Sequence, residues 1–445
     1  MSEGPQEDRA APGDLLSQPA RGSSAALVGP VPPLRVHAAL GDALSGAGSW
    51  LLRRPWWLQA LLVWAVSRAW GVLLFTVVDR QSYRQGPWGE GPLGYFRYVS
   101  IWDGTWYERI LIEDYPTEIP REPDGTAQAN AWAFYPVFPY LVRALMQVTG
   151  LPWSVAAASA ALVLGFGAAV LMLQLFRRLL PGPGALWALA VVAFSAAAPV
   201  LQASYAESLH LGLLAAALLL VLQRRALPAA PVILVMCLTR PAGVPFAAAL
   251  GLTWFIRSCL ALRDPGRGPG LGHLSRLFDR WFWLALWACA CALLWPLIAW
   301  LATGELRAYT DTETAWRGTD LVVVEPWLAL GGQFLGQGWG WLLLLAVAGG
   351  FGLVVTSRVV RAVLPLGVRV WVIAYGAYLL LFLHPQSSTF RLLLPLFVLA
   401  APLVALSDSR AYRWLLVLVG VLSQIMWVGY LWQWSPLPGG GDYPP

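Results

Sequence analysis

The chain has 445 residues, of which 58 % are hydrophobic and only 12 % are charged, and its formal net charge is +6. This composition excludes an ordinary soluble domain, in which about a quarter of the residues are charged. Apolar runs long enough to cross a bilayer recur along the chain, and they are continuous rather than alternating, which favours helices over a β-barrel. We therefore predict an all-α polytopic membrane protein.

Residues 1–48 are rich in Pro, Gly, Ser and Ala and predict a disordered tail. Arg53 and Arg54 directly precede the first apolar run at 57–77, and basic residues beside a span favour the cytoplasmic side. The tail is therefore predicted to be cytoplasmic, and the first span leads outward. All 30 basic residues are Arg, which together with the Ala, Gly and Pro content favours a bacterial source.

The first outer loop, 78–152, is the most distinctive part of the chain. It carries the motifs Trp-Asp-Gly-Thr-Trp-Tyr at 102–107 and Ala-Phe-Tyr-Pro-Val-Phe-Pro at 133–139. The acidic run from Glu113 to Asp124 between them predicts a solvated loop, and its carboxylates leave a divalent cation open. Residues 137–150 are too short to span a bilayer and predict a helix on the outer surface.

The remaining apolar runs give about eleven transmembrane helices. Arginines then fall mostly at the inner ends of the spans and acidic residues on the outer side. A second outer loop at 303–335 and a short outer tail at 436–445 complete the domain at 49–435. The predicted spans are 57–77, 153–176, 183–201, 207–223, 228–239, 242–262, 281–302, 336–356, 368–384, 391–406 and 413–434.

Four charged residues from separate parts of the chain fall at the outer membrane edge: Asp103, Glu207, Arg240 and Arg391. Charges at such positions are costly unless they are paired, which makes them functional candidates. Two arginines beside carboxylates suit a phosphate group and an acceptor hydroxyl. Structural alternatives stay open: Glu207 and Arg240 pair with each other, Arg391 extends to the lipid headgroups, or Asp103 caps a helix that begins at Gly104.

Five motifs in order along the chain resemble the PIG-V family, whose eukaryotic members are GPI mannosyltransferase 2, within the GT-C group of membrane glycosyltransferases. The resemblance covers roughly 55–405. Two departures put the identity of the acceptor in question: the segment between Tyr115 and Trp132 is longer than in the eukaryotic pattern, and Pro241-Ala242 replace Ser-Asn. The motifs are Trp-Asp-x-x-x-Tyr (102–107), Ala-Phe-Tyr-Pro-x-x-Pro (133–139), Tyr-Ala-Glu-Ser-Leu (205–209), Thr-Arg-Pro-Ala-Gly (239–243) and Arg-x-Leu-Leu-Pro-Leu-Phe (391–397).

The resemblance implies a GT-C-like bundle and transfer of mannose or another hexose from a polyprenyl-phosphate donor to a glycolipid or glycan acceptor. The active site would face outward from the plasma membrane. Asp103 matches the family's acidic residue in the first outer loop and is implied as the catalytic base, while Arg240 and Arg391 are implied as ligands of the donor phosphate. The predicted acceptor or substrate contacts are Trp102, Tyr107, Glu108, Tyr135, Glu207, Trp316 and His384, although His384 also fits an interface residue.

An inverting single displacement is the simplest mechanism, because a lipid phosphate is already a good leaving group and the enzyme only has to bind it and accept a proton. No cofactor is assigned, a divalent cation stays possible, and the four Cys lack the spacing of a zinc or redox site. The partners are membrane lipids rather than nucleic acid. A lipid-linked-sugar flippase or transporter stays open, although no inverted repeat is evident, and so does a non-catalytic assembly protein.

Overall fold

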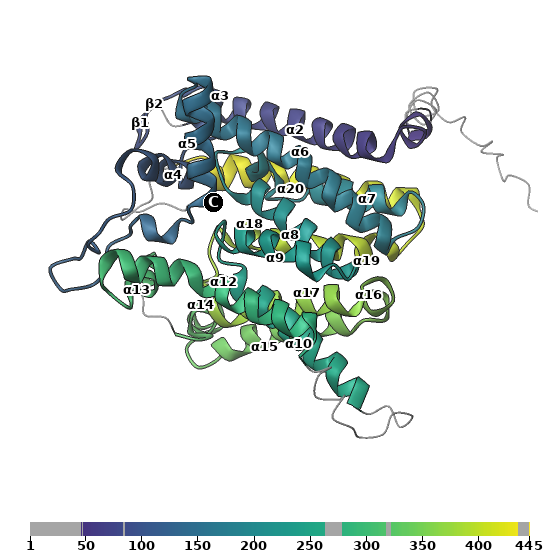
Figure 1. The fold of residues 1–445 in the computed structure, drawn as a ribbon. Helices are drawn as coiled ribbons and strands as arrows, with labels where there is room; N and C mark the ends of the chain where they lie inside the picture. The colour runs from purple at the N-terminus through teal and green to yellow at the C-terminus, as the bar shows by residue number, and fades with distance from the viewer. Residues whose placement is uncertain (1–45, 47, 83–84, 263–277, 317–321, 435–444) are drawn as a thin grey trace, which may run out of the picture. The chain divides into compact units, whose positions relative to one another are not determined.

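The computed structural model describes residues 46, 48–82, 85–262, 278–316, 322–434 and 445 (Figure 1). Within these ranges the only sheet is an antiparallel ribbon of β1 (Gln85–Gly86) and β2 (Gly89–Glu90), and the rest of the regular structure is helical. The all-α prediction is confirmed. The predicted tails at 1–48 and 436–445 lie almost entirely outside the described residues.

Full-length membrane helices are identified by their length and composition, since an apolar core of about 30 Å takes about 20 helical residues. Five described helices qualify, and a sixth candidate is a helix pair bent by 115° at a short break. The chain is therefore a polytopic membrane protein. The five are α2 (Trp56–Gln81), α6 (Trp153–Leu179), α10 (Gly243–Leu262), α12 (Arg280–Thr303) and the run of α20 (Arg410–Met426) with η5 (Trp427–Trp432); the bent pair is α14 (Glu325–Leu335) with α15 (Gly340–Thr356).

The other five predicted spans coincide with apolar helices of 10–17 residues, which are shorter than a straight span requires. One cause is visible after α7, where the chain turns at Ala193 and continues into the 3-10 helix η2 (Ala198–Gln202), which has a proline near its start. The eleven predicted spans thus correspond to five helices of full length, one bent pair and five short helices. The short ones are α7 (Gly184–Ala193), α8 (Glu207–Leu222), α9 (Ala226–Cys237), α17 (Leu366–Phe382) and the segment of η4 (Leu394–Leu399) and α19 (Ala400–Ala405).

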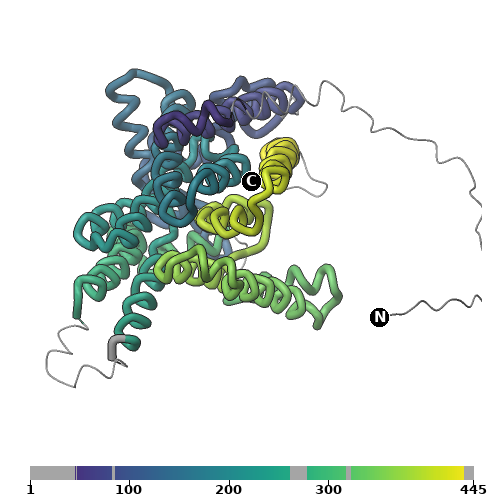
Figure 2. The backbone as a smooth tube through the Cα atoms, turned by 90° about the vertical axis from the view of Figure 1, so that its right-hand side faces the viewer, coloured from purple at the N-terminus to yellow at the C-terminus, as the bar shows by residue number. Residues whose placement is uncertain are grey.

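The helices pack in two groups that α8 and α9 join. α6 packs against α8, α2 and α7, and α10 packs against α12 and α17. α9 contacts both α8 and α12, so it connects the groups. Figures 1 and 2 show α2 and α6 on one side of the bundle and α10, α12 and α15 on the other.

Small residues allow α6 to approach its neighbours closely, as is common between membrane helices. Its buried face includes Ala157, Ala161, Gly165 and Ala168. A Cβ atom at Gly165 would lie 3.1 Å from the Ser208 Oγ atom and 3.3 Å from the Leu201 carbonyl oxygen. Gly165 therefore sets the spacing between α6 and the segment that leads into α8.

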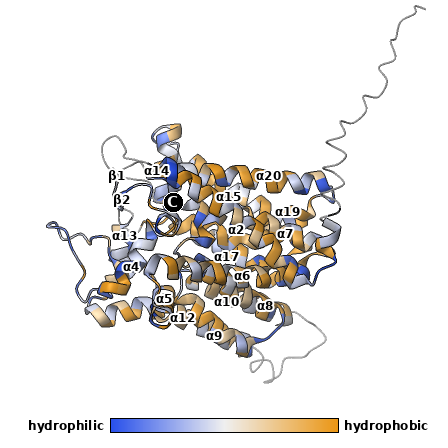
Figure 3. Cartoon of the chain, turned by 90° about the horizontal axis from the view of Figure 1, so that it is seen from above, coloured by the Kyte–Doolittle hydropathy of each residue, from blue (hydrophilic) through white to orange (hydrophobic). Residues whose placement is uncertain are grey.

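Hydrophobic residues make up much of the length of the helices, as the colours of Figure 3 show. The exposed large hydrophobic residues include Leu301, Leu353 and Met426, and each of these residues is more than 70 % exposed. Exposed apolar surface on this scale is unusual for a soluble monomer and suits contact with lipid. It agrees with the membrane class derived from helix length.

Most of the remaining short elements lie at one end of the bundle, and one of them, α16 (Arg358–Val363), lies at the other (Figure 1). The first outer loop, predicted at 78–152, contains four of them, and α5 is the predicted surface helix at 137–150. The predicted loop at 303–335 contains α13 and α14, so it is more helical than its sequence suggested. The remaining short elements are α3 (Tyr95–Tyr98), α4 (Asp103–Glu113), η1 (Ala131–Ala133), α5 (Val137–Thr149), α13 (Ala308–Ala315), α16 (Arg358–Val363) and α18 (Thr389–Leu392).

Candidate active site

The start of α4 is held in place by its aromatic neighbours. Trp102 has a φ of 61°, a left-handed conformation that is uncommon for a residue with a side chain. Its indole Nε1 donates a hydrogen bond of 2.8 Å to the Trp432 carbonyl, and its ring meets Trp88 edge-on at 4.8 Å. These contacts fix the point where α4 begins and where the next residue, Asp103, projects its carboxylate.

Asp103 does not cap α4. Trp102 occupies the N-cap position, and no side chain there accepts a capping hydrogen bond. The Asp103 backbone N–H donates to the Tyr205 hydroxyl at 3.0 Å, and the Asp103 carboxylate accepts a hydrogen bond from Arg391. The capping alternative is therefore wrong, and the carboxylate is engaged in an ion pair.

The four predicted charges lie together as one alternating chain, which we call the charge chain: Asp103, Arg391, Glu207 and Arg240. Arg391 Nη1 pairs with Asp103 Oδ2 and lies 3.5 Å from Glu207 Oε1. The same Glu207 oxygen accepts from Arg240 Nη1 at 2.6 Å. Four segments that are distant in sequence thus contribute two cations and two anions, with a formal sum of zero.

The charge chain is largely removed from solvent. The exposed fractions of its side chains are 4 % for Glu207, 9 % for Arg391, 16 % for Arg240 and 17 % for Asp103. Arg391 therefore does not extend to the headgroups, and that alternative is wrong. The predicted Glu207–Arg240 pair is confirmed as a contact, but Glu207 also lies near Arg391, so the pair is part of a larger group. In a buried site, such pairing offsets part of the cost of desolvation.

Unused hydrogen-bonding capacity remains in the charge chain. Glu207 Oε2 and Arg391 Nε are buried and have no hydrogen-bond partner in the part of the chain that the structure describes. Burial and the charge of Arg391 lower the pKa of Arg240, in the turn between α9 and α10, but Glu207, with smaller effects from Tyr107 and Asp103, raises it overall. Arg240 therefore stays cationic. The charge chain also retains a free donor, Arg391 Nε, and a free acceptor, Glu207 Oε2, for a bound molecule.

Tyr205 is a site residue that the sequence interpretation missed. Its hydroxyl contacts the Asp103 backbone, and the Arg391 guanidinium carbon lies 5.2 Å from the centre of its ring. A cation over an aromatic ring is stabilised by the quadrupole of the ring. Tyr205 thus positions both partners of the outermost ion pair, and its place in the motif Tyr-Ala-Glu-Ser was the available signal.

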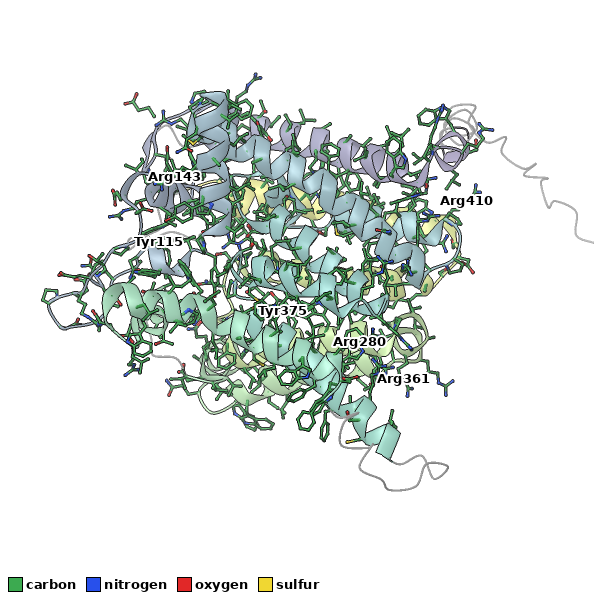
Figure 4. All side chains as sticks on the ribbon, viewed as in Figure 1. Tyr115, Arg143, Arg280, Arg361, Tyr375 and Arg410 are labelled. Carbon is green, nitrogen blue, oxygen red and sulfur yellow. The ribbon has the colours of Figure 1, made fainter. Side chains whose placement is uncertain are left out.

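Two other missed residues lie around Arg240. The Tyr375 hydroxyl donates to the Leu392 carbonyl at 2.8 Å, beside Arg391, and Tyr375 interacts electrostatically with Arg240 and Glu207. His210 follows Glu207 on α8, and both of its ring nitrogens are buried without a partner among the described residues. No sequence motif pointed to either residue, and Figure 4 shows Tyr375 well inside the bundle.

Tyr107 is a predicted substrate contact outside the charge chain that interacts with its members. It is one helical turn after Asp103 on α4, is buried, and interacts electrostatically with all four charged residues. Burial raises the pKa of its phenol, with smaller effects from Arg240 and Glu207, so Tyr107 remains a protonated donor at neutral pH. Its ring packs against Phe134 and Phe138.

The acidic residues considered with Asp103 have other environments. Glu108 is half-buried on another face of α4; burial raises its pKa, and Arg97 lowers it in part. Glu113 forms an exposed ion pair with Arg109 at 2.6 Å. Neither carboxylate joins the charge chain. In the acidic loop, Arg121 binds Glu305 and Asp311, which ties the two predicted outer loops together.

The remaining predicted contacts lie in aromatic surroundings. The Tyr135 and Tyr309 hydroxyls are hydrogen-bonded at 2.9 Å within a separate cluster that includes Trp132 and Trp295. Trp316 packs edge-on against Trp106 at 5.1 Å. The Nδ1 atom of His384 is buried without a partner within the described ranges. Across those ranges, no group of three or more His, Cys, Asp or Glu side chains is placed to hold a metal ion.

No protein-family model and no curated protein sequence matches this chain. Among solved structures, the chain is similar to the crystal structure of ArnT from Cupriavidus metallidurans bound to undecaprenyl phosphate, with 14 % sequence identity and a TM-score of 0.45. The similarity covers 80 % of this chain and 62 % of ArnT, so this chain spans less than two thirds of the length of ArnT.

Proposed function

We propose that this protein is a polyprenyl-phosphate-dependent glycosyltransferase. It moves mannose, or another hexose, to a glycolipid or glycan acceptor at the outer face of the plasma membrane, with its N-terminus in the cytoplasm. The observation that supports this function best is the buried Asp103–Arg391–Glu207–Arg240 chain. It joins two phosphate-binding side chains to a carboxylate in the loop where the resembling family has its acidic residue.

The two arginines suit the phosphate of the donor. Guanidinium groups present several N–H donors in a planar fork and bind phosphate oxygens more strongly than neutral donors do. Arg391 Nε is buried and unpartnered within the described residues, so it has a donor to offer. The same cations would stabilise the charge that develops on the leaving phosphate in the transition state.

Donor binding would also free Asp103. In the structure, the Asp103 carboxylate accepts a hydrogen bond from Arg391. When the phosphate takes over the Arg391 guanidinium, Asp103 loses this partner and can accept a hydrogen bond from the acceptor hydroxyl instead. The base would therefore become competent only after the donor has bound, which limits side reactions.

The chemical step balances in atoms and charge. The acceptor oxygen forms a bond to the anomeric carbon of the sugar, and the bond from that carbon to the phosphate oxygen breaks with its electron pair on the phosphate. The hydroxyl proton goes to Asp103. The phosphate gains one negative charge as Asp103 loses one, so the total charge of the site stays constant and no charge has to be created in a desolvated region.

The test is transfer by the purified full-length protein in liposomes that contain polyprenyl-phosphate mannose and candidate lipid acceptors. Glycosylated lipid and released polyprenyl phosphate should appear in equal amounts. Asp103→Asn should lower the rate roughly 10²–10⁴-fold, the usual contribution of a general base. Asp114→Asn is the matched control, because that carboxylate is more exposed and pairs with Arg143 at 3.7 Å. Movement of intact donor between leaflets without cleavage would instead establish the flippase alternative.

A further inference from the structure

A cavity of about 770 Å³ opens between the start of α9 and the start of α12. It lies away from the charge chain. α8 runs from Glu207 to Leu222, roughly 24 Å at 1.5 Å per residue, before the chain turns back into α9. Glu207 and Arg240 meet at one end of this hairpin, and the cavity is at the other. Figure 4 shows Arg280, which lines the cavity, at the opposite end of the bundle from Tyr115 and Arg143.

Three arginines line this cavity: Arg224, Arg225 and Arg280. All three are exposed, and none forms an ion pair within the residues that the structure describes. The nearby Asp279 carboxylate accepts from the backbone N–H groups of Trp281 and Phe282 and so serves as the N-cap of α12. The cavity therefore carries a local excess of positive charge.

The other walls of the cavity are apolar and open outward. Leu227, Trp283 and Trp287 are exposed by 86 %, 58 % and 41 %. The Trp287 indole donates to the Ala230 carbonyl at 2.9 Å, which fixes its ring against α9. One cavity thus combines a cationic rim with an aromatic and aliphatic wall, on a helix surface that is otherwise apolar.

We propose that this cavity binds an anionic phospholipid, with the phosphate among the three arginines and an acyl chain along Leu227, Trp283 and Trp287. Basic pockets between membrane helices are suited to anionic headgroups, and indole rings are favoured at the interface of the bilayer. A free phosphate ion would match the arginines but leave the apolar wall unused. The site is separate from the charge chain, so the inference does not depend on glycosyl transfer.

The experiment is native mass spectrometry of the delipidated full-length protein, titrated with phosphatidylglycerol or phosphatidylcholine of the same acyl chains. The wild-type protein should bind phosphatidylglycerol at least tenfold more tightly. Replacing Arg224, Arg225 and Arg280 together by Gln should remove this preference. Each arginine is expected to contribute about fivefold to the affinity for the anionic lipid. A triple Arg→Gln variant of Arg358, Arg361 and Arg410 is the matched control, since these are exposed arginines outside the cavity, and it should bind as the wild type does.

Three outcomes would overturn the proposal: equal affinity for the two lipids, unchanged phosphatidylglycerol binding in the cavity variant, or displacement of the lipid by equimolar glycerol 3-phosphate. The last result would assign the arginines to a soluble phosphate. A triple Arg→Lys variant of the cavity keeps the charge and should retain most of the preference. If the Gln variant unfolds, the Lys variant combined with Trp283→Ala tests the apolar wall alone, and unchanged binding there would contradict the proposal.

Discussion

Arg391 and Asp103 form an ion pair across 288 positions of sequence, and Arg391 is also within 3.5 Å of Glu207. One guanidinium thus connects the carboxylate proposed as the base to the carboxylate that holds the second arginine. Any molecule that draws Arg391 away changes the charge environment of both carboxylates at once. This shared partner is the reason why donor binding and base activation are linked in the proposed mechanism.

Arg391→Lys should separate charge from geometry. A lysine keeps one positive charge but cannot contact Asp103, Glu207 and a phosphate through a planar fork. Hydrogen bonds to charged groups contribute about 1.5–3 kcal/mol, so the KM for the lipid donor should rise roughly ten- to a hundredfold, measured in the liposome assay. Arg143→Lys is the control, because Arg143 is partly exposed and pairs with Asp114 only at 3.7 Å. An unchanged KM in Arg391→Lys would assign Arg391 a structural role.

The sequence identified Glu207, Arg240 and Arg391 because they adjoin apolar runs whose direction followed from the positions of the arginines. Asp103 was identified by its motif in the first predicted outer loop. Tyr205 was missed although its motif contains it, and no motif contains Tyr375; the roles of both depend on contacts with residues in other segments of the chain. Glu108 was considered because it is near Asp103 in sequence. Five residues along a helix are rotated by about 140° from each other, however, which turns Glu108 away from Arg391.

The lengths of the helices also could not be predicted from the sequence pattern. Hydropathy located every apolar run, but the break that bends α14 against α15 depends on close backbone packing. A Cβ atom at Gly340 would collide with the Leu328 carbonyl oxygen, and one at Gly331 with the Gly340 carbonyl oxygen. These two glycines permit the bend, and only the folded geometry shows that they face each other.

The Glu207–Arg240 pair should be strongly coupled in stability. Arg240→Gln leaves a buried carboxylate with a more distant partner and should lower the free energy of unfolding by about 3–5 kcal/mol. The double variant Glu207→Gln/Arg240→Gln should lose less than the sum of the single variants, with a coupling energy of roughly 1–3 kcal/mol. Unfolding in detergent micelles measures these values.

The control for this cycle is Arg121 with Glu305, an ion pair whose side chains are 35 % and 39 % exposed. Solvent-exposed pairs contribute about 0–1 kcal/mol, so Arg121→Gln should change stability little. Equal coupling energies for the two pairs would mean that the charge chain is solvated rather than buried.

The stability of the outer loop should depend on pH in opposite directions at two carboxylates. Burial raises the pKa of Glu108 in the folded state, so its stabilising contribution is present at low pH and is lost as pH rises through the carboxyl range. Glu108→Gln should therefore gain stability relative to the wild type between about pH 4 and pH 7. Hydrogen bonds from Thr126 lower the pKa of Asp124, so its stabilising contribution appears as pH rises to about pH 4 and is fully present above it. Asp124→Asn should therefore lose stability relative to the wild type as pH rises to about pH 4, with a constant difference at higher pH. Parallel pH profiles for the two variants would contradict these shifts.

The proposed orientation places the first outer loop and the α19–α20 turn on opposite sides of the membrane. Glu122 and Arg410 are exposed positions in these two segments, and Figure 4 shows Arg410 at the far end of the bundle from Tyr115. Single cysteines at these positions, in a background without the four native cysteines, can be labelled in intact cells with a membrane-impermeant thiol reagent. Glu122→Cys should be labelled, and Arg410→Cys should be labelled only after the membrane is permeabilised, because basic residues at span ends favour the cytoplasm. The reverse pattern would put the charge chain on the cytoplasmic side, and a donor presented at the outer face could then not reach Arg391.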